Sequence, residues 1–502
     1  MIDKLAAHFA THETAAYLVG GYVRDWLISA KPGHDIDLAV PGEAEAVAKG
    51  IASEFGGTTV PLSPSHGVIR VVVPRDPGHV DGDEIDEIDT PWVIDIGGST
   101  DGRNIEDNLV RRDFTINAMA IPLADWRSQD AVIDPFGGRS DLAAKTIRAV
   151  SSTAFQDDPG RLLRAVRLAG QLKFRIEPDT SKAIAANAHL LADVSPERVR
   201  EEFLKILSLD GAKGQLEVLD HFGLFKLVVP ELQSAKGVDQ PNMHYWDVWG
   251  HTMHAVEAAE LVTKGHQNSP IYSCVPWTPD SEAHFNRHAT DGHTRRTVLK
   301  LAALFHDVAK PQTKTQDATG RTRFFGHSEQ GAEIAANRLS QLRVGSKGID
   351  MVGKMVEQHL RPTNMKNGEE WPTNRAIYRY FRDLGDVAID TLYLCLADYL
   401  GAKGPNLVHE DWRNHARMVG HILHIGTSEP VSPTTTRLIT GHDLMTHFKL
   451  QPGPEIGVVL ERVEEARAAG EIETKEQALE MAFNALKNAA GQPLDGAHSG
   501  SN

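Results

Sequence analysis

The chain has 502 residues, of which 41% are hydrophobic and 24% charged, a composition typical of soluble globular proteins and a length that predicts about three or four domains. Its net charge of −16 disfavours indiscriminate binding of nucleic acid over the whole surface, although a local basic groove remains compatible with it. Two cysteines exclude a disulfide framework, and we find neither a signal peptide nor an apolar run of about 18 residues, so we expect a cytoplasmic protein without a membrane anchor.

Alternating strand-like and helix-like segments predict a small domain with a mixed sheet over residues 1–150. The candidate strands are 17–19, 36–40, 68–73 and 92–96, and the acidic segment 74–91 is interpreted as a solvated loop. Beyond it the pattern is one of successive amphipathic helices. The fold class is therefore α+β multidomain, with a helical neck at 151–240, a histidine-containing helical domain at 241–402 and a C-terminal helical region at 403–502 that ends in a disordered tail.

The first chemical motif lies in residues 18–40. Gly20 and Gly21 follow an apolar run and precede a short helical pattern carrying Arg24, a placement that lets backbone amides approach a phosphate. Asp35 and Asp37 lie one residue apart on the next predicted strand, so their side chains share a face and could hold two divalent cations. A D-x-D pair alone is usually a solvated turn, but the glycine motif upstream favours the metal site. The P-loop and dinucleotide-binding patterns are absent.

Two further blocks are rich in arginine. Residues 108–121 begin with Arg111, Arg112 and Asp113, and an ordinary N-capped helix is the simpler interpretation of this block by itself. In residues 156–169, Arg161, Arg164 and Arg167 recur at every third position opposite an apolar helix face. Such a stripe is often no more than a solvated face, so the pattern alone leaves both interpretations open.

Together these blocks resemble the nucleotidyltransferase superfamily that includes DNA polymerase beta, and more closely the class II tRNA CCA-adding enzymes and poly(A) polymerases. The resemblance implies a polymerase-beta-like head in which Asp35 and Asp37 are catalytic and hold Mg²⁺. It also implies a nucleotide-binding set that consists of Gly20, Gly21, Arg24, Arg112, Asp158, Arg161, Arg164 and Arg167.

Within that family the D-x-x-R pair, here Asp158 and Arg161, reads the incoming base. A carboxylate accepts from an exocyclic amine and an arginine donates to a ring nitrogen, so cytosine and adenine fit whereas uracil and guanine do not. Gly160 departs from the family pattern, which usually has a larger apolar residue at this position. The glycine predicts a looser start of the helix that follows. Asp95 on the strand 92–96 could approach the metals as a third carboxylate, but a structural role is at least as compatible.

The helical half carries an ordered set of histidines and aspartates that resembles the HD superfamily of metal-dependent phosphohydrolases. The matching ligands are His251, His306, Asp307 and Asp398, with His327 and His359 as candidate further ligands. Imidazole and carboxylate suit a second divalent metal of the transition series or Mg²⁺. Such domains can retain the fold after the chemistry is lost, so binding and hydrolysis are separate expectations.

The resemblance implies an enzyme that adds CCA to the 3′ ends of tRNA from CTP and ATP, with tRNA as its partner and the actinobacterial-type enzymes as its nearest pattern. A poly(A) polymerase, or an enzyme adding CC or A alone, shares the same head motifs and remains an alternative. A second alternative is an HD phosphohydrolase that acts on RNA or nucleotides. The oligomeric state is not predicted.

Overall fold

The computed structural model describes residues 1–29, 33–63, 67–74, 91–99, 104–241, 243–265, 268–366, 370–428 and 437–490. Two compact units account for the chain, one comprising Met1–Leu209 with Glu217–Val228 and the other comprising Asp210–Leu216 with Val229–Asn502. Most of the predicted acidic loop 74–91 and the predicted disordered tail lie outside the described residues. No helix within the described ranges is long and apolar enough to cross a membrane.

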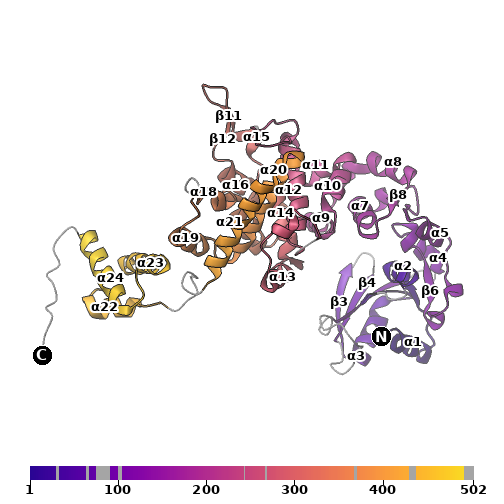
Figure 1. Cartoon of the computed structure of the whole chain (residues 1–502). Helices are drawn as coiled ribbons and strands as arrows, with labels where there is room; N and C mark the ends of the chain where they lie inside the picture. The colour runs from indigo at the N-terminus through magenta and orange to yellow at the C-terminus, as the bar shows by residue number, and fades with distance from the viewer. Residues whose placement is uncertain are drawn as a thin grey trace. The chain divides into compact units, whose positions relative to one another are not determined.

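The first unit is built on a mixed six-stranded sheet with the order β3-β4-β5-β2-β1-β6 (Figure 1). The strand pair β2·β5 is parallel and the other neighbouring strands are antiparallel. Strands occur at all four predicted positions, and β3 and β6 are additional. The strand bounds are β1 Tyr17–Val19, β2 Asp35–Pro41, β3 Thr58–Ser63, β4 Val68–Val73, β5 Trp92–Ser99 and β6 Ala120–Pro122.

Alternation along β2 separates the core of this unit from its polar face. Ile36 and Leu38 are buried in the hydrophobic core, whereas Asp35 and Asp37 occupy the other face. On the core side, helix α3 (Ala44–Phe55) packs against β4 and β5 through small and aliphatic residues at helical spacing. Helix α1 (Ile2–Thr11) contributes Leu5 to the same core, and α2 (Gly20–Ser29) packs on β2.

The segment after Arg112 is not the continuous helix that the simpler interpretation expected. It forms a 3-10 turn, η2 (Thr115–Asn117), and then enters β6 beside β1. The reason is local, because Asp113 accepts hydrogen bonds from the Phe114 amide and from Asn117 Nδ2, which closes a short turn. The surrounding short elements are α4 Ile105–Leu109, η3 Leu123–Asp125, η4 Gln129–Ala131, α5 Gly138–Ala143 and β7 Thr146–Ile147.

The neck helices follow the predicted amphipathic pattern. Helix α7 (Arg161–Leu172) buries Leu162, Leu163 and Val166, leaves the three arginines on its other side and packs against α9 (Pro196–Ser208). The remaining elements of this stretch are α6 Ala154–Asp157, β8 Arg175–Ile176, α8 Pro178–Asn187, η5 Ala188–Asp193, α10 Ala212–His221, α11 Phe225–Val228 and η6 Pro230–Ala235.

In its described residues, the second unit is built of helices and two short hairpins. Helices α12 (Val248–Val262), α14 (Arg295–Phe305), α17 (Ser346–Gln358) and α20 (Ala388–Lys403) pack together around its core. Its other elements are η7 Tyr272–Cys274, α13 Pro279–Asn286, β9 His288–Thr290, β10 His293–Thr294, α15 Lys310–Thr313, β11 Lys314–Gln316, β12 Thr322–Phe324, α16 His327–Gln341, α18 Arg361–Asn364, α19 Asn374–Leu384, η8 Gly385–Val387, η9 Gly404–Asn406 and α21 His409–Thr427.

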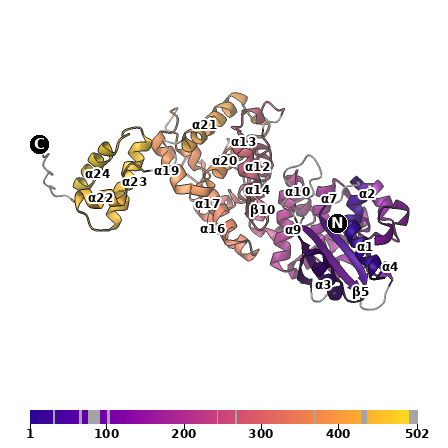
Figure 2. The same cartoon turned by 90° about the horizontal axis from the view of Figure 1, so that it is seen from below.

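Three helices at the end of the chain form a separate cluster with its own apolar core. They are α22 Gly441–Phe448, α23 Pro454–Ala468 and α24 Lys475–Ala490, and residues such as Val463 and Ala482 are completely buried among them. Figure 2 shows the three helices packed side by side. All three lie within the C-terminal helical region that the sequence predicts at 403–502.

Candidate active site

The polar face of the sheet gathers three carboxylates and one arginine. Asp35 and Asp37 project from the same side of β2, and the parallel register places Asp95 of β5 beside Asp37. Arg70 of β4 lies opposite Asp95 and donates from Nε and Nη2 to the two carboxylate oxygens, at 2.7 and 2.8 Å. Asp95 is thus close to the predicted metal ligands but is engaged in an ion pair, which supports its structural interpretation.

The electrostatics at Asp37 favour a bound cation. Burial raises the pKa of Asp37, Asp95 raises it further, and Arg112 and Arg164 oppose the shift. Ionising this carboxylate is therefore unfavourable unless positive charge is nearby. A divalent ion held by Asp35 and Asp37 would supply that charge, and oxygen ligands suit Mg²⁺. The residues present fit the implied metal.

The glycine pair lies against the carboxylates. Gly20 has a positive φ of +72°, and a Cβ placed on it would overlap Asp37 Oδ2 and come within 2.8 Å of Arg112 Nη1. The backbone amide of Gly21 donates a hydrogen bond to the Asp37 carboxylate. Glycine is needed at position 20 both for the left-handed backbone and for space beside the Asp37 carboxylate.

Arg112 and Arg164 border the same carboxylates. Arg164 Nε lies 2.7 Å from Asp113 Oδ2, and this carboxylate is only 9% exposed. Burial opposes ionisation of Asp113, but Arg164, the Asn117 side chain and the Phe114 amide hold its pKa below the usual value. Asp113 thereby fixes Arg164 at the edge of the site.

The structure does not bring Arg24 to this face with the other predicted residues. Its guanidinium is 7% exposed and donates to both oxygens of Asp25, at 2.7 and 2.8 Å, and to Asn117 Oδ1 at 2.7 Å. Arg24 therefore ties α2 to the η2 turn. This arrangement supports a positioning role, and direct contact with a nucleotide stays a prediction for Arg24.

The predicted base-reading pair lies at the start of α7. Asp158 accepts from the Gly160 amide at 3.0 Å and from Arg198 Nη2 of α9 at 2.9 and 2.8 Å, whereas Arg161 Nε is 3.9 Å from Asp158. The guanidinium of Arg161 instead donates to the main-chain oxygens of Arg111, Arg112 and Ala154. Burial opposes ionisation of Asp158, but Arg198, the Gly160 amide and Arg161 together lower the pKa of the carboxyl.

These groups line one cleft of about 640 Å³. Nine of the ten residues predicted for the nucleotidyltransferase site border it, namely Gly20, Gly21, Asp35, Asp37, Arg112, Asp158, Arg161, Arg164 and Arg167. The lining also includes residues that the sequence did not assign to the site, namely Arg70, Arg111, Asp113, Asn117, Gly160, Arg198, Glu201, Glu202 and Lys205. The cleft therefore has an acidic floor surrounded by arginines, a distribution suited to a polyphosphate with divalent cations.

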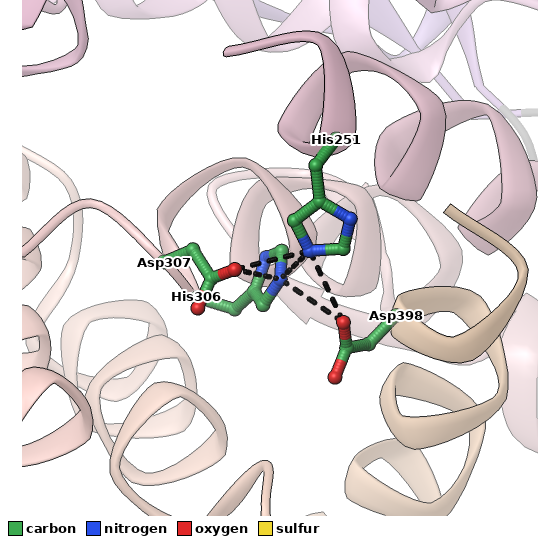
Figure 3. A group of neighbouring side chains, drawn as sticks. All are labelled: His251, His306, Asp307 and Asp398. Carbon is green, nitrogen blue, oxygen red and sulfur yellow. Dashed lines mark hydrogen bonds and ion pairs between the residues drawn. The ribbon is translucent and has the colours of Figure 1, made fainter. Parts of the chain in front are cut away.

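A second cluster lies inside the helical unit, where four side chains converge from three helices (Figure 3). His251 comes from α12, His306 and Asp307 from the end of α14, and Asp398 from α20. His251 Nε2 is 2.9 Å from His306 Nε2, 3.0 Å from Asp307 Oδ2 and 3.1 Å from Asp398 Oδ1. All four predicted ligands thus meet at one point.

The cluster has the charge distribution of a metal site. Burial disfavours a charged His306, yet Asp307 and Asp398 raise the pKa of its imidazole to about 10. The site thus favours positive charge between the buried Asp307 and the partly buried Asp398, and a divalent ion would supply it. His306 is oriented for ligation because its Nδ1 donates to the Ala303 carbonyl at 2.7 Å, which leaves Nε2 facing the cluster.

The two further candidate ligands lie on the other side of Asp307. His327 Nε2 and His359 Nε2 are 3.4 and 3.8 Å from Asp307 Oδ1, and the three residues form a second group with metal-ligand spacing. Each ring is oriented by its Nδ1 on a backbone carbonyl, that of Phe324 or Val356. Lys310 was not predicted to contribute, but its Nζ lies 2.6 Å from Asp307 Oδ2.

A sheet that carries paired carboxylates beside arginines, joined to a helical His/Asp metal site, defines a class of metal-dependent nucleotidyltransferases with an HD domain. Comparison with known families agrees. The chain matches "Poly A polymerase head domain" over residues 16–148, "Probable RNA and SrmB- binding site of polymerase A" over 173–236, and "HD domain" over 278–403. Residues 421–483 match domain 2 of the tRNA nucleotidyltransferases.

Relatives match over nearly the whole length of the chain. An A-adding tRNA nucleotidyltransferase of Deinococcus radiodurans is 32% identical over 92% of this chain and 94% of its own length. A CC-adding tRNA nucleotidyltransferase of Thermus thermophilus is 31% identical over 92% of each chain. The chain therefore belongs to the class II family of tRNA nucleotidyltransferases and poly(A) polymerases with an HD domain. The actinobacterial subtype stays a prediction.

Solved structures have the same fold. The Thermotoga maritima CCA-adding enzyme complexed with tRNA is 20% identical, with a TM-score of 0.59 over 97% of this chain and 94% of that one. A CCA-adding enzyme in complex with ATP is 19% identical, with a TM-score of 0.61 over 99% and 95%. At this identity the comparison establishes the α+β multidomain architecture, which confirms the predicted fold class.

Proposed function

We propose that the protein adds CCA to tRNA 3′ ends from CTP and ATP. One observation carries the proposal: the carboxylates Asp35 and Asp37 and the D-x-x-R pair, Asp158 and Arg161, border the same cleft. If the triphosphate of a nucleotide lies at Asp35 and Asp37, the base of the same nucleotide can lie at Asp158 and Arg161, because the cleft is continuous between them. The names of the relatives, which act on tRNA, and the complexes of related structures with tRNA, ATP and CTP support this assignment.

In the proposed reaction, the primer 3′-hydroxyl attacks the α-phosphorus of the nucleotide. A phosphodiester bond forms, the bond to the β-phosphate breaks, and pyrophosphate and the hydroxyl proton leave. Mg²⁺ bound at Asp35 and Asp37 would lower the pKa of the hydroxyl and neutralise the leaving group. The Gly21 amide holds Asp37, and Arg112 and Arg164 contact triphosphate oxygens. No histidine or lysine base is assigned.

Base selection follows from donor and acceptor geometry. Asp158 accepts from the exocyclic amine of cytosine or adenine, and Arg161 donates to the adjacent ring nitrogen. Uracil and guanine present a carbonyl and a ring N–H at the corresponding positions, so they leave both protein groups unsatisfied. In the structure Arg161 is bonded to backbone carbonyls, and on binding it would exchange one of them for the base.

A restricted activity is the second candidate, because the two relatives named above add A alone or CC alone. Three substrates decide between the candidates: tRNA ending at the discriminator base, tRNA ending in CC, and an unrelated RNA, each incubated with CTP, ATP or both. The proposal expects CCA on the first and A on the second. Addition of A restricted to the second tRNA, CC alone on the first, or long A tails on the unrelated RNA would each replace it.

The helical cluster is proposed to bind a divalent metal of its own. His251, His306, Asp307 and Asp398 supply two nitrogen and two oxygen donors, and His327 and His359 stand beside them. When loaded, such a site can activate water for phosphoester hydrolysis, which is the secondary activity to assay. We also propose domains at 1–150, 151–240, 241–402 and 403–502, with the neck carrying part of the tRNA-binding surface.

A further inference from the structure

The carboxylate proposed to read the base is already occupied by a side chain from another helix. Arg198 of α9 donates from one nitrogen, Nη2, to both oxygens of Asp158. The side chain of Arg198 is 56% exposed and that of Asp158 is 30% exposed, and both line the cleft. An incoming base therefore meets a carboxylate that has a hydrogen-bond donor before the base arrives.

Gly160 makes room for this contact. A Cβ on Gly160 would lie 2.6 Å from Arg198 Nη2 and 3.0 Å from its Cζ. The φ of Gly160 is −60°, an ordinary helical value, so backbone conformation does not require glycine at this position. The guanidinium of Arg198, however, occupies the space that a Cβ would need in this arrangement. Gly160 and Arg198 are thus matched to each other, and the glycine is the residue by which this chain departs from the family pattern at the helix start.

We propose that Arg198 is a specificity-determining residue that sets how strongly the cleft discriminates cytidine from uridine nucleotides. It acts through Asp158 as a positioning residue, and the inference rests on the proposed base-reading role of that carboxylate. Arg198 supplies Asp158 with a donor whether or not the base offers an amine.

The physical basis is the cost of an unpaired polar group. A site rejects a wrong base most strongly when that base leaves the groups of the site without partners. With UTP bound, Arg198 still satisfies Asp158, so the penalty is reduced. With CTP bound, the exocyclic amine and Arg198 compete for the same oxygens. Both effects reduce the difference in affinity between CTP and UTP, so removing Arg198 should increase that difference.

The test measures dissociation constants of CTP and UTP for the full-length protein by calorimetry with Mg²⁺ and without tRNA. In Arg198→Ala the ratio of UTP to CTP dissociation constants should rise about fivefold or more, the effect of one net hydrogen bond. Gly160→Ala should shift the ratio in the same direction, because the new methyl group displaces the guanidinium while suiting a helix. Arg200→Ala, which removes the same charge from the same helix outside the cleft lining, should leave the ratio unchanged.

A ratio that stays constant because both nucleotides weaken equally in Arg198→Ala would overturn the inference and make Arg198 a phosphate contact. A raised KM for tRNA with an unchanged ratio would overturn it in favour of an RNA contact. Asp158→Ala distinguishes the base-reading role of Asp158 from the modulating role of Arg198. If that variant keeps its preference for CTP, the base-reading proposal itself fails. If it loses the preference while Arg198→Ala does not sharpen it, the present inference alone fails.

Discussion

Asp37 on β2 lies beside Asp95 on β5 in the parallel register of the sheet, and the two differ in their partners. Asp95 is neutralised by the two nitrogens of Arg70, whereas Asp37 is half-buried and its pKa is raised by desolvation. Two similar carboxylates thus have different roles. Asp95 completes an ion pair within the sheet, and Asp37 is left as the acid whose charge a cation would stabilise.

Replacing Asp158 with Ala should weaken selection of CTP and ATP against UTP and GTP. The amine acceptor is lost, and discrimination carried by one buried hydrogen-bonding group is on the order of 1–3 kcal/mol. The measurement is kcat/KM for each nucleotide on the same tRNA. Asp157→Ala, which changes the neighbouring carboxylate outside the cleft lining, is the matched control. Equal loss of rate for all nucleotides would remove the base-reading role.

Gly20→Ala should reduce nucleotide addition at least tenfold by order of magnitude, because a methyl group at a positive φ overlaps Asp37 and crowds Arg112. The backbone strain should also lower the free energy of unfolding by about 1 kcal/mol. Gly33→Ala is the control, since no atom of the described residues lies within 4 Å of its added Cβ. Initial rates and denaturant unfolding test both parts, and a fully active Gly20→Ala enzyme would contradict the close packing at Asp37.

Arg164→Ala should destabilise the first unit by about 1–2 kcal/mol at neutral pH, an estimate reduced for the 46% exposure of Arg164. The sign of the pH dependence follows from Asp113. Its pKa in the folded state is depressed, so the stabilisation is present above the unfolded pKa and is lost as pH falls through the folded value. The difference between wild type and variant should be constant from about pH 8 to 5 and shrink below about pH 4. A difference that grows on acidification would contradict the ion pair.

Changing His306 and Asp307 together to Ala should abolish metal binding and any phosphohydrolase activity of the helical unit, because two of the four predicted ligands are lost. Nucleotide addition should persist, since the metal site proposed at Asp35 and Asp37 does not use these residues. Metal analysis and rates of addition test this expectation. The control variant changes the exposed His409 and Asp411 of α21 to Ala. Loss of nucleotide addition in the folded double variant would show that the two sites are coupled.

The sequence predicts the parts of the head site that depend on local spacing. Strand alternation is enough to place Asp35 and Asp37 on one face of β2. Helical spacing is enough to place Arg161, Arg164 and Arg167 on one side of α7. The partners of these residues depend on segments far apart in the chain. Arg70 meets Asp95 through the sheet register, and Arg198 meets Asp158 through the packing of α7 on α9.

One local pattern was misleading, and the reason can be identified. The apolar spacing after Arg112 suits a helix, but hydrogen bonds from Phe114 and Asn117 to Asp113 close a turn instead. The residues that follow pair with β1 and form β6. Arg24 follows the glycine motif closely, but its guanidinium donates to Asp25 and to Asn117, which is distant in sequence, and Arg24 is not among the residues that line the cleft. Its contact with a nucleotide stays a prediction. Arg70 did carry a usable pattern, since a charged residue inside the apolar strand VIRVVV must face a polar site.

The most direct test of the central claim is the rate of nucleotide incorporation into tRNA lacking its 3′ end by Asp37→Asn compared with wild type. The variant keeps the size of the side chain and removes its charge, so the fold should be retained. We expect the rate to fall at least about a thousandfold, because the proposed two-metal site would lose one of its carboxylate ligands. A rate close to that of the wild type would contradict the account and move the catalytic site elsewhere in the chain.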